Sequence, residues 1–330
     1  MRTEFVATGF QVPERLVTNQ DLAGMMDTSD EWIVQRSGIR TRYWVSPGET
    51  GVSLAAAAAT RALAKAGLTA RDLDCIIYCT CTPDHFEPGN GVFLQRALGV
   101  PDIPAMDVRT QCSGFLYGLS VADAWIRCGQ YARILLVGAE IHSRGLDKTT
   151  RGRDTAVLFG DGAGAVILGA TTDGGRGILS THLFADGRHA EKLWVDGPGL
   201  AHDPFVSAEM LAQGLHRPVM EGRDVFKFAS IKMPESVALA LKTHGFTTAD
   251  VKLLVPHQAN LRIIDMVKQA AGLRDDQVYA NIQKYGNTTA ASIPIALDEA
   301  LDEGRLARGD LLVLTAFGSG FTWGSAAIRW

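Results

Sequence analysis

The stretch GLTARD, residues 67–72, decides the fold, because GFTTAD at residues 245–250 repeats its pattern in the second half of the chain. Each hexapeptide has a glycine first, a threonine third and an aspartate sixth. Each lies just before a short apolar run, at 75–79 and at 252–255. Short apolar runs rich in branched residues are typical of strands buried on both faces. The repeat therefore predicts two similar units, each leading into a buried strand.

A second repeat supports the first. Cys112 and Asn287 are each followed by an aspartate eleven residues later and by a glycine seventeen residues later. Both come just before a helical pattern, so they occupy matching positions. We divide the chain into halves at 1–172 and 173–330 and expect the two halves to pack on each other.

The order of elements between these positions predicts an α/β fold, because apolar runs alternate with helical patterns. Strands are expected at 75–79, 133–137, 164–168, 252–255 and 311–314. Helices are expected at 54–66, 113–128, 237–244, 260–271 and 290–303. The stretch 186–222 carries Gly, Pro and His, so we expect surface loops there.

Composition narrows the class of protein. The chain has 330 residues, of which 46% are hydrophobic and 21% are charged. At roughly 150 residues per domain, this length fits about two domains. The net charge of −4 argues against a nucleic-acid-binding protein, which usually has a basic excess. The N-terminus lacks the apolar segment of a signal peptide, and no apolar run reaches membrane-spanning length, so we expect a cytoplasmic enzyme without a membrane partner.

The five cysteines are expected to be reduced thiols, since their number is odd and no secretion signal is seen. Cys75, Cys79 and Cys81 alternate along one predicted strand and lack a second ligand pair at zinc spacing. We interpret them as core residues and expect no metal. Cys112 precedes a predicted helix, whose N–H groups and dipole favour a thiolate. It is a candidate nucleophile, the alternative being a buried structural cysteine.

Two further residues lie at the ends of predicted strands. His257 follows the run at 252–255 and precedes a helix, where α/β folds usually place ligand-binding groups. Asn287 is either a helix cap or a hydrogen-bond donor to substrate. The repeat allows Cys112, His257 and Asn287 to converge between the two halves. A thiol with imidazole and amide donors is suited to thioester chemistry.

Two glycine-rich segments have different interpretations. The segment at 159–164 resembles a dinucleotide-binding loop, but an apolar strand pattern follows it, where that loop requires a helix. We therefore predict no nicotinamide site. The segment at 316–321 follows the last predicted strand. It forms either an ordinary tight turn or a turn whose backbone N–H groups bind an oxyanion.

With these residues in view, the sequence resembles the β-ketoacyl-acyl carrier protein synthase III family of the thiolase superfamily. The resemblance covers nearly the whole chain. It is carried by segments at 28–33, 37–40, 107–114, 159–165, 256–262, 286–294 and 321–324. It implies a five-layer αβαβα fold of two duplicated halves, and a homodimer.

The resemblance also implies a mechanism. Cys112 takes the acyl group from an acyl-CoA. Malonyl-acyl carrier protein then loses carbon dioxide, and its enolate attacks the acyl-cysteine to give a 3-oxoacyl product for fatty acid biosynthesis. His257 and Asn287 would donate hydrogen bonds to the malonyl thioester, and the backbone N–H groups of Cys112 and Ser319 would form the oxyanion hole. Coenzyme A enters as a substrate, and no cofactor is implied.

Binding residues transfer from the family by position. Coenzyme A contacts fall on Trp32, Arg36, Arg151, Gly152 and Asn260. In this interpretation Trp32 and Arg151 flank the adenine. Contacts with the carrier protein fall on Lys227, Arg262 and Lys268. The alternative for these basic residues is that they are ordinary solvated charges.

Two departures from the family leave alternatives open. The segment at 151–156 is about two residues longer than the common form, a feature shared with some alkylquinolone-pathway members. Glu87, next to Phe86, stands where the family has an apolar residue that reaches into the partner subunit's acyl pocket. A charged group there is costly to desolvate. Glu87 as the base of a non-decarboxylative condensation is therefore one alternative; simple acyl transfer and a non-catalytic carrier-protein-binding paralogue are others.

Overall fold

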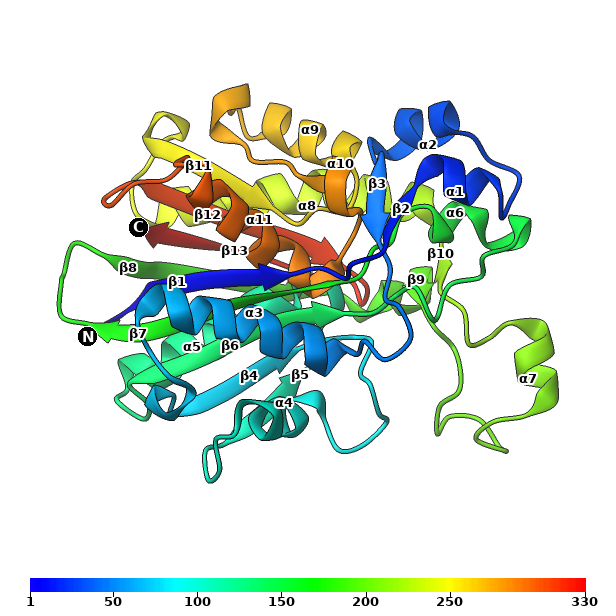
Figure 1. The fold of residues 1–330 in the computed structure, drawn as a ribbon. Coiled ribbons are helices and arrows are strands. Elements are labelled where there is room, and N and C mark those ends of the chain that lie inside the picture. The colour runs from blue at the N-terminus through cyan, green and yellow to red at the C-terminus, as the bar shows by residue number, and fades with distance from the viewer.

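Two β-sheets form the centre of the molecule in the computed structural model, which describes residues 1–330 (Figure 1). The first sheet has the order β1-β7-β6-β4-β5. Its strands are β1 (Arg2–Gln11), β7 (Gly162–Thr171), β6 (Arg133–Glu140), β4 (Cys75–Cys79) and β5 (Ala105–Val108). The second sheet has the order β11-β12-β13-β8. Its strands are β11 (Val251–Pro256), β12 (Leu311–Gly318), β13 (Thr322–Arg329) and β8 (Gly177–Ala185).

The two sheets have the same topology. In the first, β4 runs parallel to β5 and β6, while β7 is antiparallel to β6 and β1. In the second, β11 runs parallel to β12, while β13 is antiparallel to β12 and β8. A single parallel bridge from Leu254 to Val278 stands in the place of the fifth strand. Every strand of the first sheet precedes residue 173 and every strand of the second follows it.

Helices complete the five layers. α5 (Gly114–Arg127) and α11 (Ser292–Asp302) contact strands of both sheets and lie between them. α3 (Gly51–Ala66) and α4 (Asn90–Leu98) cover the outer face of the first sheet, and α8 (Gly222–Thr243) and α9 (Leu261–Ala270) cover that of the second. The largest apolar cluster fills the space around α5 and α11, with side chains from both halves. The predicted αβαβα arrangement is confirmed.

The repeated hexapeptides have a simple structural role. Each glycine follows a helix with a positive φ, 66° at Gly67 and 68° at Gly245. Asp72 accepts a hydrogen bond from the backbone N–H of Thr69 at 2.8 Å, and Asp250 accepts one from that of Thr247 at 2.7 Å. Each motif ends a helix, caps a short 3₁₀ turn and directs the chain into the next strand.

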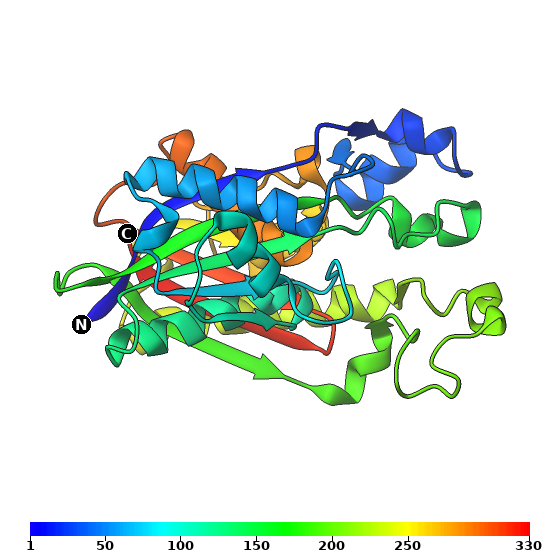
Figure 2. The same cartoon turned by 60° about the horizontal axis from the view of Figure 1, so that its bottom comes forward.

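The remaining elements gather at one end, away from the two termini (Figures 1 and 2). They are β2 (Leu16–Thr18), α1 (Asn19–Ala23), α2 (Asp30–Ser37), β3 (Thr41–Tyr43), α6 (Arg153–Ala156), β9 (Leu193–Trp194), α7 (Ala208–Gln213), β10 (Val219–Met220) and α10 (Ile282–Tyr285). Both views show that the stretch around α7, residues 195–218 between β9 and β10, stands out from the body. None of the helices is long and apolar enough to cross a membrane.

The five predicted strands and five predicted helices are all present, with ends that differ by a few residues except at α8, which begins fifteen residues before the predicted 237. Within the two central sheets, β1, β5, β8 and β13 were not among the five predicted strands, and outside them neither were β2, β3, β9 and β10. The loops predicted at 186–222 contain the short elements β9, α7 and β10. The segment at 159–164 leads into β7 and not into a helix, as its sequence pattern predicted.

Candidate active site

Cys112 lies in the 3₁₀ turn Gln111–Ser113, between β5 and the first residue of α5. Gln111 has a φ of 45°, which is uncommon for a residue other than glycine and which sets the turn that directs Cys112 inward. Gly318, at the end of β12, faces it: a Cβ added to this glycine would lie 2.9 Å from the Cys112 Sγ and 2.5 Å from its Cβ. Only glycine therefore fits beside the thiol.

The electrostatic surroundings of the thiol differ from the prediction. Burial raises the pKa of the Cys112 thiol to about 12, and the nearby Glu140 carboxylate adds to the rise. The backbone N–H groups of Ser319 and of Cys112 itself oppose it by favouring the thiolate. Donors at the helix N-terminus favour the thiolate as predicted, but desolvation outweighs them, so the thiol is the stable form in the free site. The two N–H groups lie within hydrogen-bonding reach of the Cys112 sulfur.

His257 is buried just after β11, and its two ring nitrogens have different surroundings. Nδ1 lies 2.7 Å from the Ser292 hydroxyl, at the start of α11. That hydroxyl also accepts from the backbone N–H of Gln258 at 3.4 Å, so it is free to donate to Nδ1. Nε2 then carries the proton, and it is buried without a partner. Burial, with a smaller contribution from His142, lowers the pKa of His257 to about 3, so the ring is a neutral N–H donor.

Asn287 is fixed by backbone groups from both halves. Its backbone N–H donates to the backbone carbonyl of Leu158 at 2.8 Å, and its backbone carbonyl accepts from the N–H of Gly160 at 3.0 Å. Its side-chain Oδ1 accepts from the backbone N–H of Thr289 at 2.9 Å. Because this bond occupies the amide oxygen, the Nδ2 group is left as a donor without a partner in the protein. The interpretation of Asn287 as a helix cap is wrong, because the N-cap of α11 is Ala291; the bond to Thr289 is a local turn that orients the amide.

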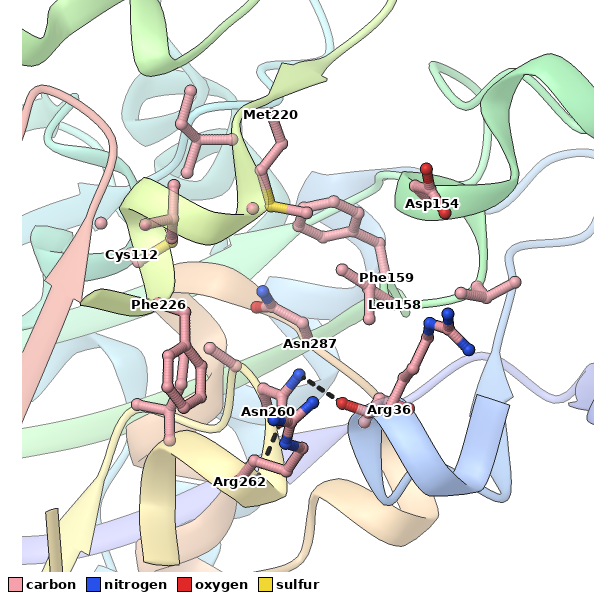
Figure 3. A pocket seen from close by; sticks show the side chains of 18 of the residues that line it. Arg36, Cys112, Asp154, Leu158, Phe159, Met220, Phe226, Asn260, Arg262 and Asn287 are labelled. Atoms are coloured by element: carbon pink, nitrogen blue, oxygen red, sulfur yellow. Dashed lines mark hydrogen bonds between the residues drawn. The ribbon is translucent and has the colours of Figure 1, made fainter. Parts of the chain in front are cut away.

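These three residues line one cavity of about 440 Å³ (Figure 3). Figure 3 shows Asn287 between Cys112 on one side and Arg36 on the other. Of the predicted site residues, the cavity brings together Trp32, Arg36, Cys112, His257, Asn260, Arg262 and Asn287. The cavity is therefore a path from the basic outer residues to the nucleophile.

Asn260 joins two elements at the mouth of this cavity. Its Nδ2 donates to the backbone carbonyl of Arg36 at 2.9 Å, and its Oδ1 accepts from the backbone N–H of Arg262 at 2.9 Å (Figure 3). Asn260 thereby caps α9 and holds the end of α2 against it. The amide that was predicted to contact the pantetheine arm is already occupied on both ends.

The position predicted for Arg151 is taken by another arginine. The Nε of Arg151 donates to Asp147 at 2.8 Å, while the guanidinium of Arg153 lies 4.8 Å from the centre of the Trp32 ring. Arg36 lies 4.2 Å from the same ring. Gly152 packs against the Asp147 backbone, where a Cβ would meet the carbonyl oxygen at 2.2 Å. In this segment it is therefore the second arginine, Arg153, that lies next to Trp32.

The basic residues predicted to contact the carrier protein divide into two groups. The guanidinium of Arg262 lies 5.4 Å from the Phe226 ring, and Lys227 is exposed nearby on α8. Arg223, which the sequence did not single out, lines the first cavity. Lys268 instead pairs with Asp265 at 3.2 Å and Asp275 at 2.7 Å, and it lines neither of the two cavities that meet at Cys112.

A second cavity, of about 390 Å³, also reaches Cys112. Ser319 and His142 lie in its wall, together with Trp194 of β9 and Val195, which follows it. The two cavities share three lining residues, Cys112, Phe159 and Leu193. The nucleophile thus lies where two separate spaces meet.

Phe86 and Glu87 do not line either cavity of their own chain. The Phe86 side chain is 70% exposed and packs only edge-on against Phe205, and Glu87 is exposed beside it. The structure of one chain therefore does not bring the predicted acyl-pocket residues to Cys112.

Cys81 corrects the interpretation of the three strand cysteines. Cys75 and Cys79 are buried in the core as predicted, but β4 ends at Cys79, and Cys81 lines the second cavity. Its thiol, the Glu140 carboxylate and the His142 ring lie close enough to suggest a metal site. However, Glu140 accepts from Thr80 at 3.0 Å and from the Thr82 hydroxyl at 2.5 Å, besides two backbone N–H groups. These bonds already satisfy the carboxylate, so we interpret the group as a hydrogen-bond network.

Glu140 could have been noticed in the sequence. It is the last residue of β6, directly after the apolar run at 134–139, and burial raises its pKa to about 7 against the donors that hold it. Ser292 carried no such signal. It lies 35 residues from His257 and meets it only through the fold.

A buried thiol with an imidazole and an amide donor, set between two duplicated halves, defines a condensing enzyme of the thiolase fold. Models of 3-oxoacyl-[acyl-carrier-protein] synthase III and of its C-terminal region match residues 106–187 and 241–330. The chain belongs to the β-ketoacyl-[acyl-carrier-protein] synthase III family.

Individual relatives match over the full length. A β-ketoacyl-[acyl-carrier-protein] synthase III from Rhizorhabdus wittichii is 46% identical over 329 residues, covering 100% of this chain and 99% of the relative. One from Rhizobium rhizogenes is 48% identical, covering 98% and 97%. The crystal structure of 3-oxoacyl-[acyl-carrier-protein] synthase III from Aquifex aeolicus has a TM-score of 0.91 at 40% identity, covering 99% of this chain and 100% of that one.

Proposed function

We propose that the chain catalyses the decarboxylative condensation of an acyl-CoA with malonyl-acyl carrier protein, giving 3-oxoacyl-acyl carrier protein through an acyl-Cys112 intermediate. One observation carries this proposal. Two donors without protein partners, the Nε2 of His257 and the Nδ2 of Asn287, lie in the same cavity as the Cys112 thiol. The names of the full-length relatives support it.

The first step loads the nucleophile. The Cys112 sulfur bonds to the acyl carbon, the bond from that carbon to the coenzyme A sulfur breaks, and the thiol proton leaves with coenzyme A. The acyl oxygen accepts from the backbone N–H groups of Cys112 and Ser319 as its charge develops. The thioester arm occupies the first cavity and the acyl chain occupies the second, because Cys112 lies where the two meet.

The second step forms the carbon–carbon bond. The malonyl carboxylate leaves as carbon dioxide, and its electron pair forms an enolate on the thioester. The enolate oxygen accepts from His257 Nε2 and Asn287 Nδ2, and each such donor is worth roughly 3 kcal/mol of barrier. The enolate carbon then attacks the acyl carbon, and the Cys112 sulfur leaves. A neutral imidazole suits this step, because it offers an N–H without needing a proton from solvent.

The outer residues bind the carriers. We propose that Trp32, Arg36 and Arg153 meet the nucleotide end of coenzyme A, with Arg153 in the role first predicted for Arg151. Arg223, Lys227 and Arg262 offer a basic rim to an acidic carrier protein. Lys268 contributes less, since two carboxylates already hold it.

We also propose a homodimer. Large apolar side chains are exposed together on the stretch around α7 and on the neighbouring loop: Phe86, Val195, Leu200, Phe205, Val206 and Leu211. Exposed apolar surface of this kind marks protein interfaces. Light scattering should give twice the chain mass of 35.5 kDa, and a Phe205→Asp variant should shift the population towards single chains.

The deciding experiment measures carbon dioxide release from malonyl-acyl carrier protein, with and without acyl-CoA, while intact-protein mass follows the acyl group on Cys112. Release that depends on acyl-CoA supports the proposal. Acylation without release would overturn it and favour acyl transfer or a non-decarboxylative condensation. Glu87→Gln separates these two, because only a Glu87 base would make that variant inactive.

A further inference from the structure

The second cavity carries several polar side chains in a wall that is otherwise apolar. Side chains with hydrogen-bonding groups line much of it: Thr82, Arg109, Gln111, His142, His216 and Thr289. A pocket for a saturated hydrocarbon chain needs none of them, since burying polar groups without partners costs free energy.

Three of these groups have no partner in the protein. The Nδ1 of His216 is buried without a hydrogen bond. The Arg109 guanidinium makes no ion pair or hydrogen bond, and neither does the Gln111 side-chain amide. Arg109 is exposed, so water can pair with its guanidinium, whereas the buried Nδ1 of His216 is the unpaired group that indicates a ligand.

The charges of the wall have one sign. Arg109 is the only formally charged residue among those that line the cavity, and no aspartate or glutamate does so. Burial lowers the pKa of both His142 and His216, so these rings are neutral donors or acceptors. Glu140 lies behind Thr82 and Cys81, where donors surround it.

We propose that the acyl group accepted by Cys112 ends in a carboxylate, which Arg109, Gln111 and His216 bind in the second cavity. This inference rests on the proposed function and names its substrate class: coenzyme A thioesters of short dicarboxylic acids. Arg109 supplies the charge, and the amide and the imidazole supply hydrogen bonds that fix the chain end. The transfer to Cys112 is otherwise the thioester exchange described above.

The test compares thioesters of equal chain length. Glutaryl-CoA is set against pentanoyl-CoA, and succinyl-CoA against butyryl-CoA, by kcat/KM for carbon dioxide release and by the rate of acylation on Cys112. We expect the carboxylated member of each pair to be preferred by at least about tenfold, as a charge-assisted hydrogen bond allows.

Variants locate the preference. Arg109→Gln should lower kcat/KM for glutaryl-CoA about 10- to 100-fold and reverse the ratio to pentanoyl-CoA. His216→Phe should lower the same ratio by a smaller factor. Arg71→Gln is the matched control, because Arg71 is an exposed arginine of a distant turn without any partner, and it should leave both rates unchanged.

Two results would overturn the inference. A wild-type preference for pentanoyl-CoA, with Arg109→Gln affecting both substrates equally, would show that the cavity does not read a carboxylate. A preference for carboxylated substrates that appears only after Glu87→Gln would show that Arg109 meets Glu87 of a second copy instead. In both cases carbon dioxide release would persist, whereas failure of the proposed function would abolish release with every thioester.

Discussion

The turn before α5 and the turn before α11 have nearly the same backbone but carry different chemistry. Each is a 3₁₀ turn whose first residue has a positive φ, 45° at Gln111 and 47° at Thr289, and each leads into a central helix. Cys112 is the second residue of its turn and lies between two cavities. Asn287, whose amide oxygen is already bonded, lies two residues before its own turn, so the predicted match between the two residues is three positions out. The duplicated scaffold supplies similar turns, and the side chains placed in or beside them supply the roles.

The largest expected effect separates those roles. Cys112→Ala should abolish the mass increase from acyl-CoA, because Cys81, the other thiol that lines a cavity, is hydrogen-bonded to Glu140 and has a pKa well above its usual value. Asn287→Ala should leave that mass increase nearly intact but slow carbon dioxide release about 10²- to 10³-fold, since its donor acts on the enolate. Single-turnover assays of the two steps check this. Equal loss of both steps in Asn287→Ala would contradict the assignment.

A pair of substitutions tests the positive-φ residues that precede Asn287 and Cys112. A Cβ at Gly286 would lie 2.9 Å from the Leu158 carbonyl oxygen, and the residue's φ is positive, so Gly286→Ala should cost about 1–3 kcal/mol of unfolding free energy. Gln111→Gly should stay within about 1 kcal/mol of wild type, because relief of strain at its φ of 45° offsets the entropy of glycine. Urea denaturation measures both. A destabilised Gln111→Gly would show that its side chain stabilises the free protein.

Glu140 allows a test of what raises the pKa of the Cys112 thiol. Its carboxylate contributes to the raised pKa of Cys112, so Glu140→Gln should lower that pKa and allow alkylation of the thiol at lower pH. The rate of iodoacetamide modification against pH gives the shift. Glu31→Gln, an exposed acid on α2, serves as the control and should leave the profile unchanged. If the pH profile of Glu140→Gln matches that of wild type, burial alone sets the pKa of the Cys112 thiol.

The smallest expected effect is that of pH on the rate of carbon dioxide release. Because burial lowers the pKa of His257 to about 3, its ring stays neutral as pH falls through the ordinary histidine range near 6.5. Carbon dioxide release from enzyme already acylated on Cys112 should therefore hardly change between about pH 5.5 and 8. A loss of rate centred near pH 6.5 would show instead that His257 becomes protonated in the working site.

Local patterns were enough to predict the duplicated halves, the central elements and the three chemical residues, because each depends on neighbours close in sequence. The Gly-to-Asp repeat is a helix end and a cap, both local devices. Contacts between distant segments were not predictable in this way. The hydrogen bond between Ser292 and His257 depends on packing, and the position of Arg153 beside Trp32 depends on packing and on loop length. The high pKa of Cys112 could not be predicted either, because it results from burial, and burial depends on the whole fold.

The backbone bonds from Asn287 to Leu158 and Gly160 have one further consequence. They tie the working donor of one half to the chain of the other, at the point where the reaction occurs. Neither half could therefore be excised as an active fragment. Halves made as separate polypeptides would recover activity only on reassociation, and the rate of recovery would report how fast this seam closes.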